Sequence, residues 1–184
     1  RFPLALRAHE SVADTIYGVH RRPTHANTTW QAAHFEKSMQ RWVDLSETGF
    51  GVAVLNDGKY AYGASSNELN INLLRSPIYP DHFADQGEHH VTYSVYPHLG
   101  GWAEGGVVEE AIALNSPLIA ATGRREHRWG LMEQSGIPLT LGALKQAEDG
   151  DGLIIRLHEA HGRRGASILS FATPMAGIEA VDLP

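Results

Sequence analysis

The apolar and polar residues of this chain follow the short alternations that are typical of β-strands. Val43 and Leu45 alternate with polar or aromatic neighbours over residues 41–46, which predicts a strand with two different faces. The run FGVAVLN (50–56) is short and apolar throughout, a pattern typical of a strand covered on both faces. Similar patterns predict further strands at 15–20, 59–63, 69–74, 89–98, 137–145, 152–159, 165–172 and 177–183.

Turn signals separate these strands. The tripeptide NDG (56–58) predicts a hairpin turn into 59–63, because asparagine and glycine readily adopt positive φ. The stretch EDGDG (148–152) predicts a second hairpin turn. Pro23 indicates that 21–29 is a structured loop rather than a central strand.

The helix signal is confined to one stretch. Apolar residues form a stripe along 102–114, and Asn-Ser-Pro at 115–117 ends the predicted helix. Two prolines within 76–86 predict a loop there. The pattern therefore predicts an all-β, antiparallel β-sandwich fold with one short helix. The expected organisation is a portion of a large β-sandwich domain at 1–120, a linker or mobile loop at 121–138 and a small C-terminal β domain at 139–184.

The composition argues against some classes of binding partner and indicates a cellular location. The 184 residues include 15 Lys+Arg and 21 Asp+Glu, a net charge of −6, which argues against a nucleic-acid-binding surface. No apolar run is long enough to span a bilayer, so we expect no membrane partner. The absence of cysteine fits a reducing compartment, and we expect a cytoplasmic location. The chain begins at Arg1 and is expected to be a piece of a longer product.

Several consecutive blocks of the sequence resemble one enzyme family. They are RPTHANTTW, RWVDLSETGFGVAVLNDGKYAYG, LNINLLRSP, DQGEHHVTYSVYPH and, later, ALKQAEDGDGLIIRLHEAHG. In order and spacing they resemble the C-terminal β region of glycoside hydrolase family 38, the retaining class II α-mannosidases, in its bacterial and vacuolar-type members. The resemblance implies that the large β region is part of a galactose mutarotase-like supersandwich.

The resemblance also implies which chemistry lies elsewhere. A retaining mannosidase needs a carboxylate nucleophile and a carboxylic acid, and in this family zinc, or another divalent metal, assists them from the N-terminal catalytic domain. None of the blocks of that domain is found here, so we expect no catalytic residue, no metal ligand and no cofactor in this chain. His89 and His90 are adjacent and point to opposite faces of a strand, which does not suit a shared metal ion.

Candidate contact residues gather in the polar, aromatic stretch that follows Pro23. Sugar rings stack on aromatic faces while polar side chains bind their hydroxyls. His25, Asn27, Trp30 and Phe35 are therefore candidates for substrate contact or for an interface between domains. The resemblance implies that Arg156 also lies at the rim of the family's active site, although the residue also fits an exposed position on a strand.

The leading hypothesis is an accessory β region of an α-mannosidase that hydrolyses terminal α-mannosides with retention. It would support the catalytic domain of the same polypeptide, close part of its cleft and be inactive alone. Two alternatives are an autonomous module that binds mannose-containing glycans and a structural or oligomerisation domain that forms a homo-oligomer.

Overall fold

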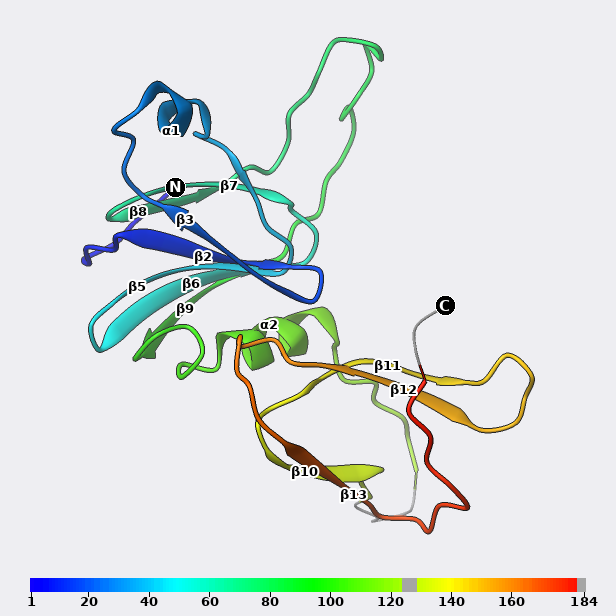
Figure 1. Cartoon of the computed structure of the whole chain (residues 1–184). Coiled ribbons are helices and arrows are strands. Elements are labelled where there is room, and N and C mark those ends of the chain that lie inside the picture. Colours follow the sequence, from blue (N-terminus) through cyan, green and yellow to red (C-terminus); the bar gives the residue numbers. More distant parts are fainter. Residues whose placement is uncertain (124–128, 182–184) are drawn as a thin grey trace. The chain divides into compact units, whose positions relative to one another are not determined.

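The computed structural model describes residues 1–123 and 129–181, which form two compact units, Arg1–Leu118 and Ile119–Pro184 (Figure 1). Every strand pair among the described residues is antiparallel. The all-β, antiparallel prediction is thus confirmed, but the described residues contain a second helix, α1 (Thr29–Ala33), besides α2 (Val107–Asn115).

Two sheets make up the first unit. The larger has the order β3-β2-β5-β6-β9, with bounds Gly18–Pro23, Glu10–Thr15, Trp42–Glu47, Phe50–Asn56 and Tyr93–Leu99. The smaller has the order β1-β8-β7-β4, with bounds Phe2–Pro3, Glu68–Ile71, Ala61–Ser65 and Lys37–Ser38. Strand order shows that the chain crosses between the sheets after β1, after β3, after β4, after β6 and after β8.

The main hydrophobic core lies on one face of the larger sheet. Val43 pairs with Val54 across β5 and β6, and these residues belong to one buried cluster with Tyr62 and Leu69 of the smaller sheet. Alternate residues of a strand point to opposite faces, so the intervening residues of β5 and β6 form a second buried layer.

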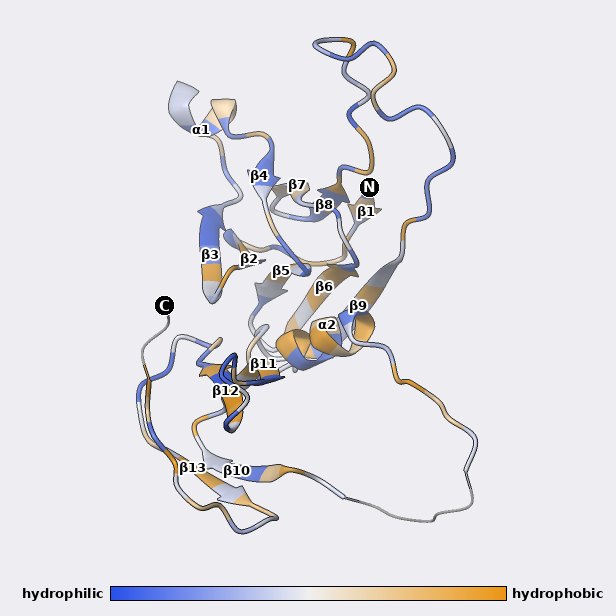
Figure 2. Ribbon diagram, turned by 90° about the vertical axis from the view of Figure 1, so that its right-hand side faces the viewer, coloured by the Kyte–Doolittle hydropathy of each residue, from blue (hydrophilic) through white to orange (hydrophobic). Residues whose placement is uncertain are grey.

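The second layer is covered by α2 and the turns before it. Trp42 is completely buried and stacks on Trp102, with ring centroids 5.2 Å apart. Val107, Val108 and Ala111 of α2 are also buried, and Figure 2 shows hydrophobic stretches on both α2 and β6. The prediction that 50–56 is covered on both faces is confirmed. The helix itself starts later than the predicted 102–114, because Gly106 at its N-cap has φ of 73°.

A buried ion pair lies in this second layer. His98 Nε2 is 2.8 Å from Asp44 Oδ2, and the two side chains are 2% and 0% exposed. Burial lowers the pKa of His98, but the hydrogen bond and charge of Asp44 outweigh it and raise the pKa above its ordinary value. Gly51 allows this arrangement, since a Cβ there would lie 2.3 Å from His98 Cε1.

Several sequence predictions fail in the first unit. The predicted loop at 21–29 begins inside β3, an edge strand, and the predicted strand at 89–98 starts only at Tyr93, in β9. The stretch 15–20 spans the β2–β3 turn rather than a strand, and Tyr17 has φ of 60° there. The 56–58 turn forms, with Asn56 Oδ1 accepting hydrogen bonds from the backbone of Gly58 and Lys59, but it is no hairpin. Both sides of β6 are already paired with β5 and β9, so the chain continues to β7 in the other sheet.

The described residues of the second unit contain two separate strand pairs. They are β10 with β13 (Met132–Gly136 and Ser167–Phe171) and β11 with β12 (Thr140–Gln146 and Leu153–His158). The predicted hairpin turn at 148–152 is confirmed. The expected linker or mobile loop at 121–138 is wrong where it includes β10, because those residues form a strand. Residues 177–181 are not a strand, and 124–128 and 182–184 lie outside the described residues. The domain boundaries expected at residues 120 and 139 remain predictions.

In the part of the chain that the structure describes, none of the helices has the length and apolar character needed to cross a membrane.

Candidate functional site

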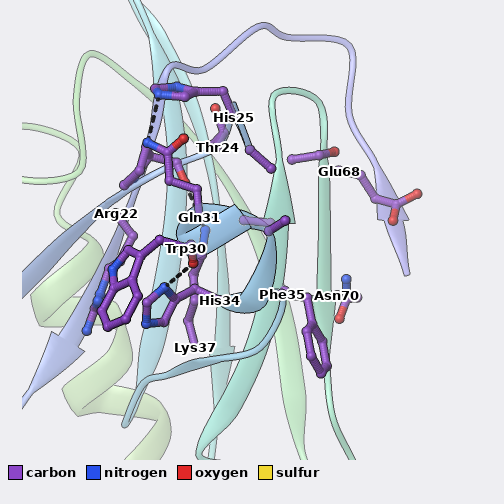
Figure 3. A pocket seen from close by; sticks show the side chains of 16 residues that line it. Arg22, Thr24, His25, Trp30, Gln31, His34, Phe35, Lys37, Glu68 and Asn70 are labelled. Carbon is purple, nitrogen blue, oxygen red and sulfur yellow. Dashed lines mark hydrogen bonds between the residues drawn. The ribbon is translucent and has the colours of Figure 1, made fainter. Parts of the chain in front are cut away.

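A cavity of about 530 Å³ opens on the first unit, beside α1. Its volume lies in the range of small-molecule pockets, roughly 300–1,000 Å³. One wall is the continuous segment from the end of β3 through α1 to β4, and the other is the β7–β8 hairpin. The lining side chains that Figure 3 labels are Arg22, Thr24, His25, Trp30, Gln31, His34, Phe35, Lys37, Glu68 and Asn70.

Local hydrogen bonds fix the first wall. Thr24 donates its backbone N–H to His9 O and its hydroxyl to Ala8 O, at 3.0 and 2.7 Å, which ties the loop to the segment just before β2. Thr28 and Gln31 then form a capping box, in which each side chain accepts from the other's backbone N–H. The cap stabilises the first turn of a helix that has no buried residue of its own.

This short helix presents aromatic rings to solvent. The Trp30 and His34 rings meet edge to face, with centroids 5.3 Å apart, and His34 Nδ1 is 2.8 Å from Trp30 O. Figure 3 shows these two rings together on one side of α1, while Phe35 lies apart from them, toward Asn70. Trp30 is 76% and Phe35 78% exposed, so neither ring is part of the core of the described chain.

The second wall adds hydrogen-bonding groups. Gly63 and Asn70 are opposite residues of the β7–β8 pair, and the Asn70 amide lies over Gly63, where a Cβ would be 2.7 Å from its Nδ2. Glycine at position 63 therefore makes room for an amide at the cavity wall. Glu68, from the same strand as Asn70, supplies a carboxylate.

Cationic groups line the cavity beside the aromatic rings. Lys37 Nζ donates to Pro23 O at 2.9 Å and lies 5.9 Å from the centre of the Tyr62 ring. Burial, and then the nearby charge of Arg22, lower the pKa of Lys37 below its ordinary value. The cavity thus combines aromatic faces with ammonium, guanidinium, amide and carboxylate groups, a set that suits either a polyhydroxylated ligand or a polar protein segment.

The structure brings three of the five predicted contact residues together. His25, Trp30 and Phe35 line the cavity. Asn27 does not line it, and its backbone N–H instead donates to Gln31 Oε1 at 2.8 Å. Arg156 belongs to β12 of the other unit, where its Nε is buried without a hydrogen-bond partner among the described residues.

Sequence reasoning missed most of the second wall and α1 itself. The pattern T-x-x-Q at 28–31 is a capping-box signal and would have located α1. Glu68 and Asn70 carried no such signal, because they reach the cavity only through pairing between strands far from the loop in sequence. Among the described residues, no group of three His, Cys, Asp or Glu side chains has the geometry to hold a metal ion.

Two family models match the chain. Residues 1–83 match the glycosyl hydrolases family 38 C-terminal domain, and residues 138–183 match the glycosyl hydrolases family 38 C-terminal beta sandwich domain. The two matches fall in the first and second compact units, respectively.

Relatives and solved structures agree with these matches. The chain is 38% identical over 180 residues to alpha-mannosidase 2C1 from Homo sapiens and 35% identical over 183 residues to alpha-mannosidase G from Dictyostelium discoideum. These alignments cover 95% and 94% of this chain but only 17% and 16% of the relatives. An alpha-mannosidase structure from Enterococcus faecalis shares the fold, with a TM-score of 0.77 at 22% identity, over 92% of this chain and 21% of that one.

Proposed function

Because the chain belongs to glycoside hydrolase family 38, as its C-terminal β region, we propose that it is the accessory part of an α-mannosidase. The complete enzyme would hydrolyse terminal α-mannosides with retention of configuration. The observation that carries the proposal is the similarity to alpha-mannosidase 2C1 from Homo sapiens, which is 38% identical over 95% of this chain.

The proposal divides the work between two parts of one polypeptide. Retaining hydrolysis needs two carboxyl groups about 5–5.5 Å apart across the scissile bond. We assign both of them, and the zinc or other divalent ion, to the catalytic domain outside this chain, since the chain spans only about a sixth of the length of its curated relatives. This chain alone would then be inactive.

The cavity beside α1 is the part of this chain that we assign to the rim of the active-site cleft or to the joint with the catalytic domain. Its support is the exposure of Trp30 and Phe35, which leaves large apolar faces available to a partner. His25 would bind hydroxyl groups in the first case and polar groups of the adjoining domain in the second. Arg156 is a further candidate from the second unit.

The test is hydrolysis of an aryl α-mannoside by this chain and by the full-length product, each with and without added zinc. We expect turnover by the full-length product only. Turnover by this chain alone would refute the division of work, and no turnover by the full-length product with any aryl α-mannoside would refute the assigned activity.

A second function is favoured by one observation, the exposed indole at the mouth of a cavity of ligand size. A carbohydrate-binding module would bind mannose or manno-oligosaccharide saturably without the catalytic domain. Trp30→Ala should abolish that binding, whereas Trp129→Ala, which removes a 60% exposed indole of the other unit, should not. Calorimetric titration of both variants distinguishes this function from the first.

A further inference from the structure

A long segment without regular structure, residues 72–92, connects β8 to β9 and extends well beyond both sheets of the first unit (Figure 1, Figure 2). Loops longer than about 12–15 residues are uncommon within compact domains and usually have a function of their own. We call this segment the β8–β9 loop.

The far end of the β8–β9 loop carries large apolar side chains. Ile78, Tyr79 and Phe83 are 75%, 83% and 74% exposed. Their neighbours in the loop are polar or charged, including Asp81, His82 and Gln86. Exposed apolar side chains with polar neighbours in the sequence match the composition of an interaction surface, in which a few buried anchors are accompanied by groups that remain solvated.

Hydrogen bonds within the β8–β9 loop fix the backbone that carries these side chains. The Asp85 carboxylate accepts from the backbone N–H of Ser76 at 2.8 Å, and Asp85 O lies 2.9 Å from His89 Nε2, which closes the loop across its width. At the tip, Asp81 Oδ1 accepts from the backbone N–H of Phe83 at 2.8 Å. An ordered loop loses little conformational entropy on binding, so these contacts prepare the tip for docking.

The base of the loop is fixed to the segment that follows α1. Glu36 accepts a hydrogen bond from Asn72 Nδ2 at 2.6 Å and forms an ion pair with Arg75. Two carboxylate contacts therefore hold the loop in a defined direction relative to the sheet.

We propose that Ile78, Tyr79 and Phe83 dock into an apolar pocket on the part of the same polypeptide that lies outside this chain. The inference rests on the proposed function, and it adds the surface through which the accessory region holds its catalytic partner. The length of the relatives indicates what covers the tip of the loop. Relatives that align with 94–95% of this chain extend over about six times its length, so most of the polypeptide is available to cover the tip. Within the described residues, the tip packs against neither sheet.

Hydroxyl-radical footprinting of the full-length product tests this directly. The oxidation rate of Tyr79 and Phe83 is measured in the folded protein and again in denaturant, and the ratio gives the shielding of each side chain. We expect both to be oxidised roughly five- to tenfold more slowly when folded, since an interface anchor loses most of its accessible area. Tyr17, 52% exposed in the β2–β3 turn, is the internal reference and should be shielded far less.

A matched pair of variants completes the test. Ile78→Asp places a charge in the proposed interface and should restore rapid oxidation of Tyr79, whereas Ile16→Asp changes a similarly exposed isoleucine (68%) and should not. Rapid oxidation of Tyr79 in the folded wild type would overturn the proposal, as would shielding that disappears on dilution, which would indicate a second copy as the occupant. Hydrolysis of an aryl α-mannoside is measured on the same samples: an active enzyme with an exposed tip refutes this inference alone, and an inactive wild type refutes the proposed function.

Discussion

Replacing Asp44 by asparagine should destabilise the first unit strongly. The substitution keeps the shape of the side chain and removes its charge, so His98 loses its counterion while the surrounding layer stays in place. Asp44 is also hydrogen-bonded by Ser46 Oγ, and it lies completely buried between β2 and β6 of the larger sheet. The His98 side chain is only 2% exposed, so its burial shields the imidazole from water that would otherwise replace the lost carboxylate.

The size of the effect follows from that burial. Removing one partner of a buried ion pair costs about 3–5 kcal/mol, a large share of the roughly 5–15 kcal/mol that stabilises a typical domain. Glu10→Gln is the matched control, because Glu10 pairs with Arg21 across β2 and β3 with side chains 46% and 55% exposed. Losing such a solvent-exposed pair costs about 0–1 kcal/mol.

The loss of stability caused by Asp44→Asn should also depend on pH. His98 has a pKa in the folded protein above that in the unfolded chain, so the folded state holds the proton more tightly. The stabilisation is fully present below the unfolded pKa, about 6.5, and is lost as the pH rises through the folded pKa. Asp44→Asn removes it, so the free energy lost should be larger at about pH 5.5 than at about pH 9.

Urea denaturation of the wild type and both variants, followed by tryptophan fluorescence, measures these differences. Trp42 and Trp102 stack in the same layer as the ion pair and report on its unfolding. A loss below about 1 kcal/mol for Asp44→Asn, or an equal loss at both pH values, would refute the reasoning.

Three further predictions concern single contacts. Gly51→Ala should cost about 1–3 kcal/mol in urea denaturation, because its Cβ would overlap His98, whereas Gly130→Ala, with open space around it, should change little. Thr28→Ala removes the α1 N-cap, about 1 kcal/mol of local stability, and should speed amide exchange in α1 without moving the global midpoint; an unchanged exchange rate would contradict the role of the cap. Trp30→Ala should leave the midpoint within about 0.5 kcal/mol yet reduce turnover of an aryl α-mannoside by the full-length product, and full activity would remove this residue from the proposed cleft or domain joint.

The strands that the sequence predicted well are those whose burial is decided locally. FGVAVLN forms β6 because every residue after Phe50 is buried, so a continuous apolar run was a sufficient signal. The sequence predicts the 56–58 turn correctly, but it wrongly predicts that the following strand pairs with β6. Pairing depends on which sides of β6 are already occupied. That information lies in β9, far along the chain.

The candidate site was partly predictable for the same reason. His25, Trp30 and Phe35 come from one continuous segment, and their polar and aromatic character marked it. The other wall comes from β7 and β8, which reach the cavity through the pairing of β4 with β7. β10 was missed because it pairs with β13, a strand more than thirty residues later, and its sequence MEQSG has neither apolar alternation nor strong strand propensity.

The ends of the two sheets have a consequence for behaviour at high concentration. Three of the four outermost strands of the first unit contain proline: Pro3 in β1, Pro23 in β3 and Pro97 in β9. The fourth, β4, has only two residues. Proline offers no N–H to an incoming strand, and a two-residue edge offers almost no template. The first unit is therefore protected against edge-to-edge aggregation.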